Sequence, residues 1–146
     1  MTKYCTNSSY GTVDGKSMLD PEDDAAYVNW GPEWRMPTDA QQNELLDYCT
    51  WNTATRNGVN GGLLIGPNGN TLFLPPAGNY GSSLHYLGTI GCYWSCSLTH
   101  ASSPQGGENV ANHLYFSWGD LNWEYDAAYY YRYRGHSVRA VRASQQ

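Results

Sequence analysis

Apolar residues first occur at helical spacing between Asp20 and Gly31. Asp20 is a good N-cap, Pro21 suits the first helical position, and acidic residues fill the first turn. Ala25, Ala26 and Val28 would then face inward, and Gly31 would end the helix. The sequence therefore predicts one short helix over residues 20–31.

A second helix is predicted after Pro37, because Thr38 and Gln41 have the spacing of a capping box. Its apolar stripe consists of Ala40, Leu45, Leu46 and Cys49. This helix would end near Trp51. Cys49 is then interpreted as a small buried hydrophobic residue rather than a reactive thiol.

From Gly61 onward the apolar spacing changes to that of β-strands. Apolar runs at 63–65 and 71–74 flank Pro67-Asn68-Gly69-Asn70, and Asn-Gly between two such runs is a strong hairpin signal. Further strands are predicted over 93–95, 113–118 and 137–142, with loops over 77–91 and 101–107. Two helices followed by strands predict an α+β fold, a single domain over residues 1–146, with a small mixed or antiparallel sheet.

Length and charge narrow the range of partners. The chain has 146 residues, which suits one domain, and a net charge of -5 disfavours nucleic-acid binding. It has no run of 18 apolar residues, so we expect no membrane insertion. The first residues are polar, so we expect no signal peptide in the chain as given.

Four cysteines are present, and they allow three disulfide pairings among which the sequence does not choose. They are Cys5, Cys49, Cys92 and Cys96. Cys92 and Cys96 would share one face of a strand, too far apart for a direct bridge. They lack a second metal-binding pair, so we expect no zinc site.

Acidic residues at 20–24 allow a calcium site as the alternative to a helix start. These residues are Asp20, Glu22, Asp23 and Asp24. Because helix N-termini favour such acids and EF-hand spacing is absent, the helix start is preferred. We therefore expect neither a metal nor a cofactor.

Aromatic residues are concentrated between positions 118 and 136. They are Trp118, Trp123, Tyr125, Tyr129, Tyr130, Tyr131 and Tyr133. A chain of this size cannot bury all of them, so some must face water, as contact surfaces do. Trp118 and Trp123 are the ones expected to pack on the sheet. The mixture of Tyr, Trp, Ser, Gly, Asn and Arg is typical of an antibody combining loop.

Catalysis is the competing interpretation of the same segment. His100, His113 and His136 could pair with Asp120 or Asp126 for acid–base chemistry, yet no pair has a recognised motif spacing. We therefore expect a binding protein and not an enzyme. Its partner would be a protein or a glycan on a cell surface.

Several segments, in their order along the chain, carry a resemblance to a known family. They are Gly31-Pro-Glu-Trp-Arg-Met-Pro-Thr38, Leu45-Leu46, Gly66-Pro-Asn-Gly-Asn-Thr-Leu-Phe-Leu-Pro-Pro-Ala-Gly78, Gly91-Cys-Tyr-Trp-Ser-Cys-Ser97, Leu114-Tyr-Phe116 and Gly135-His-Ser-Val-Arg-Ala-Val141. Together they resemble the FISUMP family, the Fibrobacter succinogenes major paralogous domain, over nearly the whole chain. Members usually carry more residues before Tyr4, so the natural N-terminal strand would be missing or replaced here.

The resemblance implies a C-type-lectin-like fold, displayed on the cell surface, secreted, or carried on a phage virion. Some similar proteins are variable proteins of diversity-generating retroelements, whose altered codons lie near the 3′ end of the gene. The resemblance then implies a ligand-binding surface of diversified residues on a fixed core. We expect these residues to be Thr99, His100, Ser102, Ser103, His113, Ser117, Asp120, Asn122, Tyr125, Asp126, Tyr129, Tyr130, Tyr133, Arg134 and His136.

Two alternatives stay open at this point. One is an undiversified surface adhesin or lipoprotein domain; the other is an enzyme related to formylglycine generation. The enzymes that generate formylglycine in sulfatases are relatives that the resemblance implies, and they use paired cysteines near the final strand. The final segment of this chain lacks such a pair, and the signatures of calcium-dependent sugar-binding lectins are also absent. The division between core and surface predicts that Trp94→Ala unfolds the protein, whereas Tyr130→Ala leaves its stability nearly unchanged.

Overall fold

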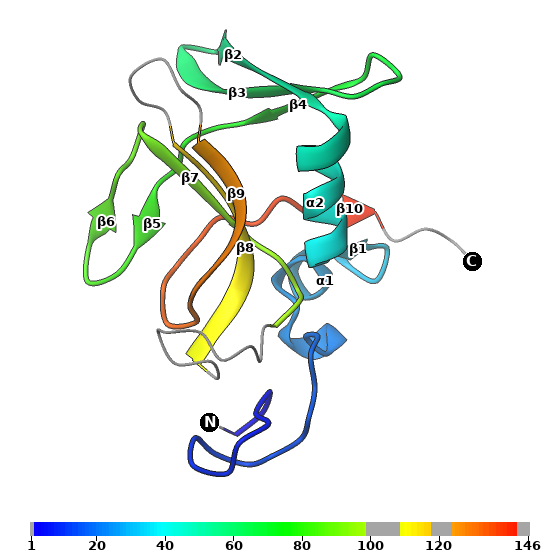
Figure 1. The fold of residues 1–146 in the computed structure, drawn as a ribbon, viewed down its shortest axis with the longest axis vertical. Coiled ribbons are helices and arrows are strands. Elements are labelled where there is room, and N and C mark those ends of the chain that lie inside the picture. The colour runs from blue at the N-terminus through cyan, green and yellow to red at the C-terminus, as the bar shows by residue number, and fades with distance from the viewer. Residues whose placement is uncertain (1, 99–108, 118–123, 143–146) are drawn as a thin grey trace.

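The computed structural model describes residues 2–98, 109–117 and 124–142, and only the backbone of 124–129. The helical elements are a 3-10 turn, η1 (Pro21–Asp23), and the helices α1 (Ala25–Trp30) and α2 (Asp39–Tyr48). The strands are β1 (Trp34–Arg35), β2 (Thr50–Arg56), β3 (Val59–Ile65), β4 (Thr71–Leu74), β5 (Asn79–Tyr80), β6 (Leu84–His85), β7 (Ile90–Trp94), β8 (Val110–Ser117), β9 (Glu124–Tyr131) and β10 (Val141–Arg142). All paired strands are antiparallel, so the predicted α+β class is confirmed (Figure 1).

The first helix begins later than the sequence predicted. Asp24 has an extended backbone that separates η1 from α1, and its carboxylate accepts hydrogen bonds from the amides of Ala26 and Tyr27. Asp24, not Asp20, is therefore the capping residue of the α-helix. Ala26 is buried as predicted, but Ala25 is exposed and Val28 is 60% exposed, so the predicted inward orientation of these two residues is wrong.

The second helix confirms its predicted start. Thr38 and Gln41 form the capping box, with both reciprocal hydrogen bonds present. The helix ends at Tyr48, slightly before the predicted end, because the chain enters β2 at Thr50. Gln42 is buried and donates from Nε2 to the carbonyl of Tyr93 at 2.9 Å, which ties α2 to the central sheet.

One sheet has the order β2-β3-β4. The predicted hairpin at 67–70 is confirmed, with Ile65 paired to Thr71 and Gly69 at φ 79. A second hairpin, between β2 and β3, was not predicted. It turns at Asn57-Gly58, where both residues have positive φ, as the most favoured two-residue turn requires.

The central sheet has the order β7-β8-β9, and its inner face builds the main core. Leu64, Leu74, Tyr93, Leu114 and Phe116 form one buried cluster between this sheet and β3–β4. In Figure 1, α2 lies beside these two sheets, and its residues Leu45 and Leu46 pack against the cluster.

The segments around β7 differ from prediction. Residues 77–91, predicted as loop, include the short β5–β6 hairpin. The predicted strand over 137–142 is instead one parallel bridge between Tyr93 and Ser137, followed by β10 paired with β1. Among the described residues, no helix is long and apolar enough to cross a membrane.

Candidate functional site

Strand pairing places three chemically distinctive side chains on the outer face of the central sheet. Trp94 on β7 lies directly opposite His113 on β8, and Cys92 lies two residues before Trp94. Side chains two apart on a strand share a face, and so do directly paired residues. This face is the opposite one to that of Tyr93 and Leu114, which belong to the core.

A later segment adds His136 to the same face. The parallel bridge between Tyr93 and Ser137 is made by the Ser137 amide donating to the Cys92 carbonyl at 3.0 Å and the Trp94 amide donating to the Ser137 carbonyl at 2.9 Å. Ser137 pairs with Tyr93, and side chains alternate between the two faces of a sheet along each strand. The side chain of His136 therefore points to the same face as those of Cys92 and Trp94. His136 therefore lies over the sheet beside them.

The two histidines form the centre of an aromatic cluster. Their Nδ1 atoms are 3.2 Å apart and their ring centroids 4.9 Å apart. Trp94 stacks on His136 with centroids 4.0 Å apart and planes at 18°. Tyr130 is 5.9 Å from His113 and 5.6 Å from His136. Two aromatic side chains thus enclose the histidine pair.

Arg134 connects this cluster to the exposed surface. Its guanidinium lies over the rings of Tyr130 and Tyr133, at 5.9 Å and 5.6 Å from their centroids. Tyr133 also stacks on Tyr131, with centroids 5.2 Å apart and planes at 16°. Although Tyr133 is 73% exposed, it is held on two sides.

The β5–β6 hairpin extends the exposed aromatic area. Tyr80 exchanges both backbone hydrogen bonds with Gly135, at 2.7 and 2.8 Å, which joins the hairpin to the loop that carries Tyr133. Tyr80 and its cross-strand partner Leu84 are 55% and 51% exposed. We call Tyr80, Leu84, Tyr133 and Arg134 the Tyr133 surface.

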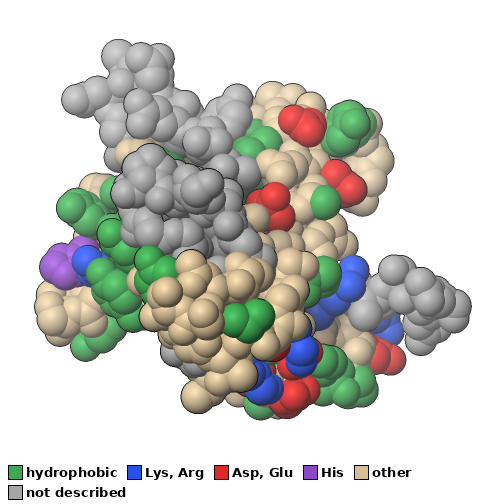
Figure 2. All heavy atoms as spheres, turned by 60° about the horizontal axis from the view of Figure 1, so that its bottom comes forward, with side chains coloured by type: hydrophobic (Ala, Val, Ile, Leu, Met, Phe, Trp, Pro, Cys, Tyr) green, Lys and Arg blue, Asp and Glu red, His purple; other side chains and the backbone are tan. Residues whose placement is uncertain are grey.

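The space-filling view agrees with this grouping. Figure 2 shows hydrophobic side chains gathered at the left of the molecule, beside histidine and basic side-chain atoms, on the side where Figure 1 places β5 and β6. Tyr86 and Leu87, which follow β6, are also more than 60% exposed. A large apolar area at the end of one hairpin is typical of a contact site.

Burial sets the protonation of the inner cluster. Desolvation lowers the pKa of His113 to about 4 and that of His136 to about 3, and the positive charge of Arg134 contributes to the second shift. Both imidazoles are therefore neutral at pH 7. Burial raises the pKa of the Cys92 thiol to about 11, so it is protonated and a weak nucleophile at neutral pH.

Five of the predicted ligand-binding residues are brought together by the structure. They are His113, Tyr130, Tyr133, Arg134 and His136. Among them His113 is only 2% exposed, so it lies beneath the surface and not on it. It lies beneath the surface because Trp94, Tyr130 and His136 pack against it.

The other predicted positions are placed in part or not at all. Ser117 is half-buried at the far end of β8, away from the cluster. Tyr125, Asp126 and Tyr129 lie in β9, where only the backbone is described. Thr99, His100, Ser102, Ser103, Asp120 and Asn122 lie outside the described residues, as do Trp118 and Trp123.

Several exposed aromatic residues were missed by the sequence reasoning. Tyr80 and Leu84 lie in a segment predicted as loop, and no periodic pattern marks them. Trp30 and Trp34 meet edge to face with centroids 6.2 Å apart, are 57% and 38% exposed, and line a cavity of about 460 Å³ with Arg139. The only sequence signal for this pair was the occurrence of two tryptophans within five residues, on either side of Gly31.

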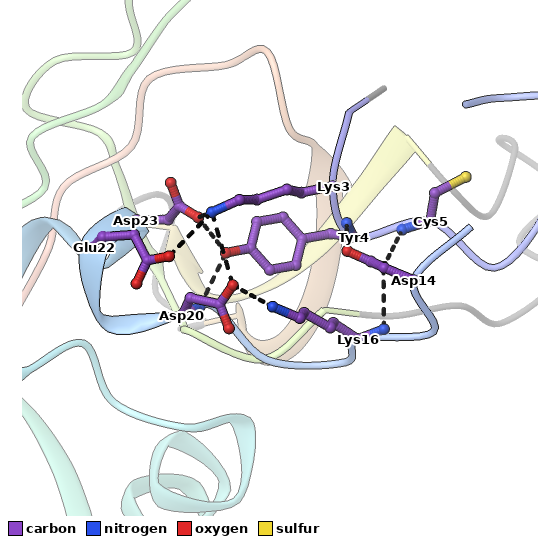
Figure 3. Close-up of polar contacts among 8 residues, drawn as sticks. All are labelled: Lys3, Tyr4, Cys5, Asp14, Lys16, Asp20, Glu22 and Asp23. Atoms are coloured by element: carbon purple, nitrogen blue, oxygen red, sulfur yellow. Dashed lines mark hydrogen bonds and ion pairs between the residues drawn. The ribbon is translucent and has the colours of Figure 1, made fainter. Parts of the chain in front are cut away.

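The acidic residues at 20–23 already face positive charges. Figure 3 shows Lys3 Nζ between Asp23 and Glu22, 2.7 and 3.2 Å from their oxygens, and Lys16 paired with Asp20. Two ammonium groups thus neutralise most of the charge that a calcium ion would need. These ion pairs connect the N-terminal segment to η1, which favours a structural role for the acidic residues over calcium binding.

Comparison of the chain with models of known protein families, with curated proteins and with solved structures found no match. The FISUMP resemblance and the C-type-lectin-like fold therefore stay predictions. Function is argued below from the geometry of the described residues.

Proposed function

We propose that this protein is a non-catalytic binding domain that contacts a protein ligand on a cell surface through the Tyr133 surface. The observation that carries the proposal is Tyr133 itself, which is 73% exposed yet stacked on Tyr131 and covered by Arg134. An exposed aromatic ring held in place loses little entropy on binding. Tyr and Arg are the residue types that dominate binding hot spots.

The surroundings support binding over catalysis. Both buried histidines are neutral, and the Cys92 thiol is protonated at pH 7. The aromatic cluster has no charged carboxylate among its described members. These features favour contact area over acid–base or nucleophilic chemistry, and no specific feature of the described site favours the formylglycine-generating alternative.

We include in the proposal a C-type-lectin-like fold and retroelement-diversified surface positions, because together they account for the separation of the surface residues from the core. Tyr133 and Arg134 lie together in the loop after β9, while Phe116 and its neighbours form a separate core. Substitutions at such surface positions usually change stability little. Sequencing the DNA beside the gene tests this part: a reverse transcriptase gene with an adenine-mismatched template repeat supports it, and their absence leaves an undiversified adhesin.

A cell-binding assay tests the binding proposal. The labelled chain is applied to intact bacterial cells, since the resemblance implies a cell-surface or phage-borne domain, and Tyr133→Ala is compared with Tyr48→Ala. Tyr48 is 69% exposed on α2, away from the Tyr133 surface, so it is a matched control. We expect Tyr133→Ala to weaken binding at least tenfold, since a central aromatic contributes about 2 kcal/mol.

Treating the cells separates the two ligand classes. Loss of binding after protease treatment supports a protein ligand, whereas loss after periodate oxidation alone shows a glycan and contradicts the protein assignment. Equal binding by wild type, Tyr133→Ala and Arg134→Ala would refute the Tyr133 surface as the contact site.

A further inference from the structure

The inner part of the aromatic cluster contains three potential metal ligands from separate segments. One ligand atom from each of Cys92, His113 and His136 lies within 4.8 Å of the other two. The two Nδ1 atoms are 3.2 Å apart. Nitrogens bound to a tetrahedral zinc at 2.0–2.1 Å are about 3.3 Å apart, so the observed spacing already matches a coordinated pair.

The backbone holds these ligands in place independently of their side chains. Cys92 lies on β7 and His113 on the neighbouring strand β8, where Cys92 pairs with Tyr115 and Trp94 pairs with His113. The two hydrogen bonds of Ser137 to β7 fix the residue before it, His136. A site assembled on paired strands is preorganised, which favours metal binding.

Hydrogen bonding alone does not account for the histidine pair. If one Nδ1 donates to the other, each ring has one nitrogen left over, and His136 Nε2 is buried without a hydrogen-bond partner among the described residues in either tautomer. Buried polar atoms without partners are uncommon and need an explanation.

We propose that Cys92, His113 and His136 bind a zinc ion, with one thiolate and two neutral imidazoles as ligands. On binding, the Cys92 thiol releases its proton to solvent and a sulfur–zinc bond forms, so no redox step is involved. Nitrogen and sulfur ligands in this combination suit zinc, and three protein ligands leave a fourth position for water or another ligand. Trp94 and Tyr130 would form the walls of the site.

The protonation of the free protein is compatible with this assignment. The lowered pKa values of both histidines leave their lone pairs free at neutral pH. The thiol pKa of about 11 must fall on zinc binding, as it does in zinc sites generally. The proposal does not depend on the binding function of the Tyr133 surface.

Cobalt substitution tests the site without any activity assay. The full chain is freed of metal with a chelator and titrated with Co²⁺, and the absorption spectrum is recorded. We expect one equivalent of Co²⁺ to give a thiolate-to-cobalt charge-transfer band and intense visible bands of tetrahedral cobalt, and Zn²⁺ to abolish them. A folded wild-type chain without these bands would overturn the proposal.

Matched variants assign the ligands. Cys92→Ser is expected to remove the charge-transfer band, whereas Cys96→Ser, which changes an equally buried cysteine outside the cluster, should retain it. If Cys92→Ser does not fold by circular dichroism, His136→Gln replaces it, with His85→Gln as the control. Retention of the bands in a folded ligand variant, or their loss in a control, refutes the assignment.

Discussion

Mild acid should destabilise the metal-free protein through its buried histidines. Both pKa values are lower in the folded protein than the ordinary value of 6.5, to about 4 for His113 and about 3 for His136. Between these values and 6.5 the unfolded chain binds more protons, so stability is complete above pH 6.5 and is lost as pH falls. The shift of His113 from 6.5 to about 4 corresponds to about 3 kcal/mol at roughly 1.4 kcal/mol per pH unit.

The contribution of His136 is smaller than its shift suggests, because it is partly exposed and coupled to His113. About 2 kcal/mol should be lost between pH 6.5 and 5, an interval above the titration of the carboxylates. The Cys92 thiol beside the pair stays protonated over this interval, because burial raises its pKa to about 11. The loss in this interval therefore reports the two histidines.

Urea unfolding at pH 7.0, 6.0 and 5.0, with a chelator present, measures this loss. His136→Gln should reduce the pH dependence, and His85→Gln, which changes an exposed histidine, should leave it unchanged. A free energy of unfolding that stays constant between pH 6.5 and 5 would refute the burial argument. Zinc added at pH 7 should raise the unfolding midpoint of the wild type only if the metal site exists.

Three substitutions test the packing and the caps. Gly91→Ala places a Cβ 2.1 Å from the buried ring of Phe116, so we expect a loss of roughly 1–3 kcal/mol in urea unfolding, and an unchanged midpoint would contradict the core packing. Asp24→Ala removes the α1 cap and the partner of the buried Met36 amide, 2.9 Å away, and should cost about 2–3 kcal/mol by thermal unfolding. Thr38→Ala removes the cap of α2 and should lower the free energy of unfolding by about 1 kcal/mol. Asp24 is the more buried of the two capping residues, so a larger loss for Thr38→Ala than for Asp24→Ala would contradict this argument.

The structure changes which aromatic residue is expected to tolerate substitution by alanine without loss of stability. Tyr130, expected to be a neutral position, is half-buried and contacts both histidines and Arg134. Tyr133 is the better variant, because its ring is largely exposed. Trp94→Ala remains a destabilising change in expectation, since it removes the ring that covers His136.

Local signals in the sequence determined the features that depend on neighbouring residues. The capping box at Thr38, the end of α1 at Gly31 and the hairpin at Asn68-Gly69 are set by backbone groups within a few positions of one another. Of the aromatic residues predicted between positions 118 and 136 whose side chains the structure describes, Tyr133 is exposed, whereas Tyr130 and Tyr131 are half-buried. The α+β class follows from these local elements in their order.

Only the tertiary structure decided which distant residues meet. Cys92, His113 and His136 are brought together by strand pairing and one parallel bridge, and no spacing within the sequence encodes that contact. The tertiary structure also packs Trp94, Tyr130 and His136 against His113, whereas it leaves Tyr80 exposed on the β5–β6 hairpin. Propensity and spacing act over a few residues, whereas sheet register places side chains from segments far apart in the chain on one face.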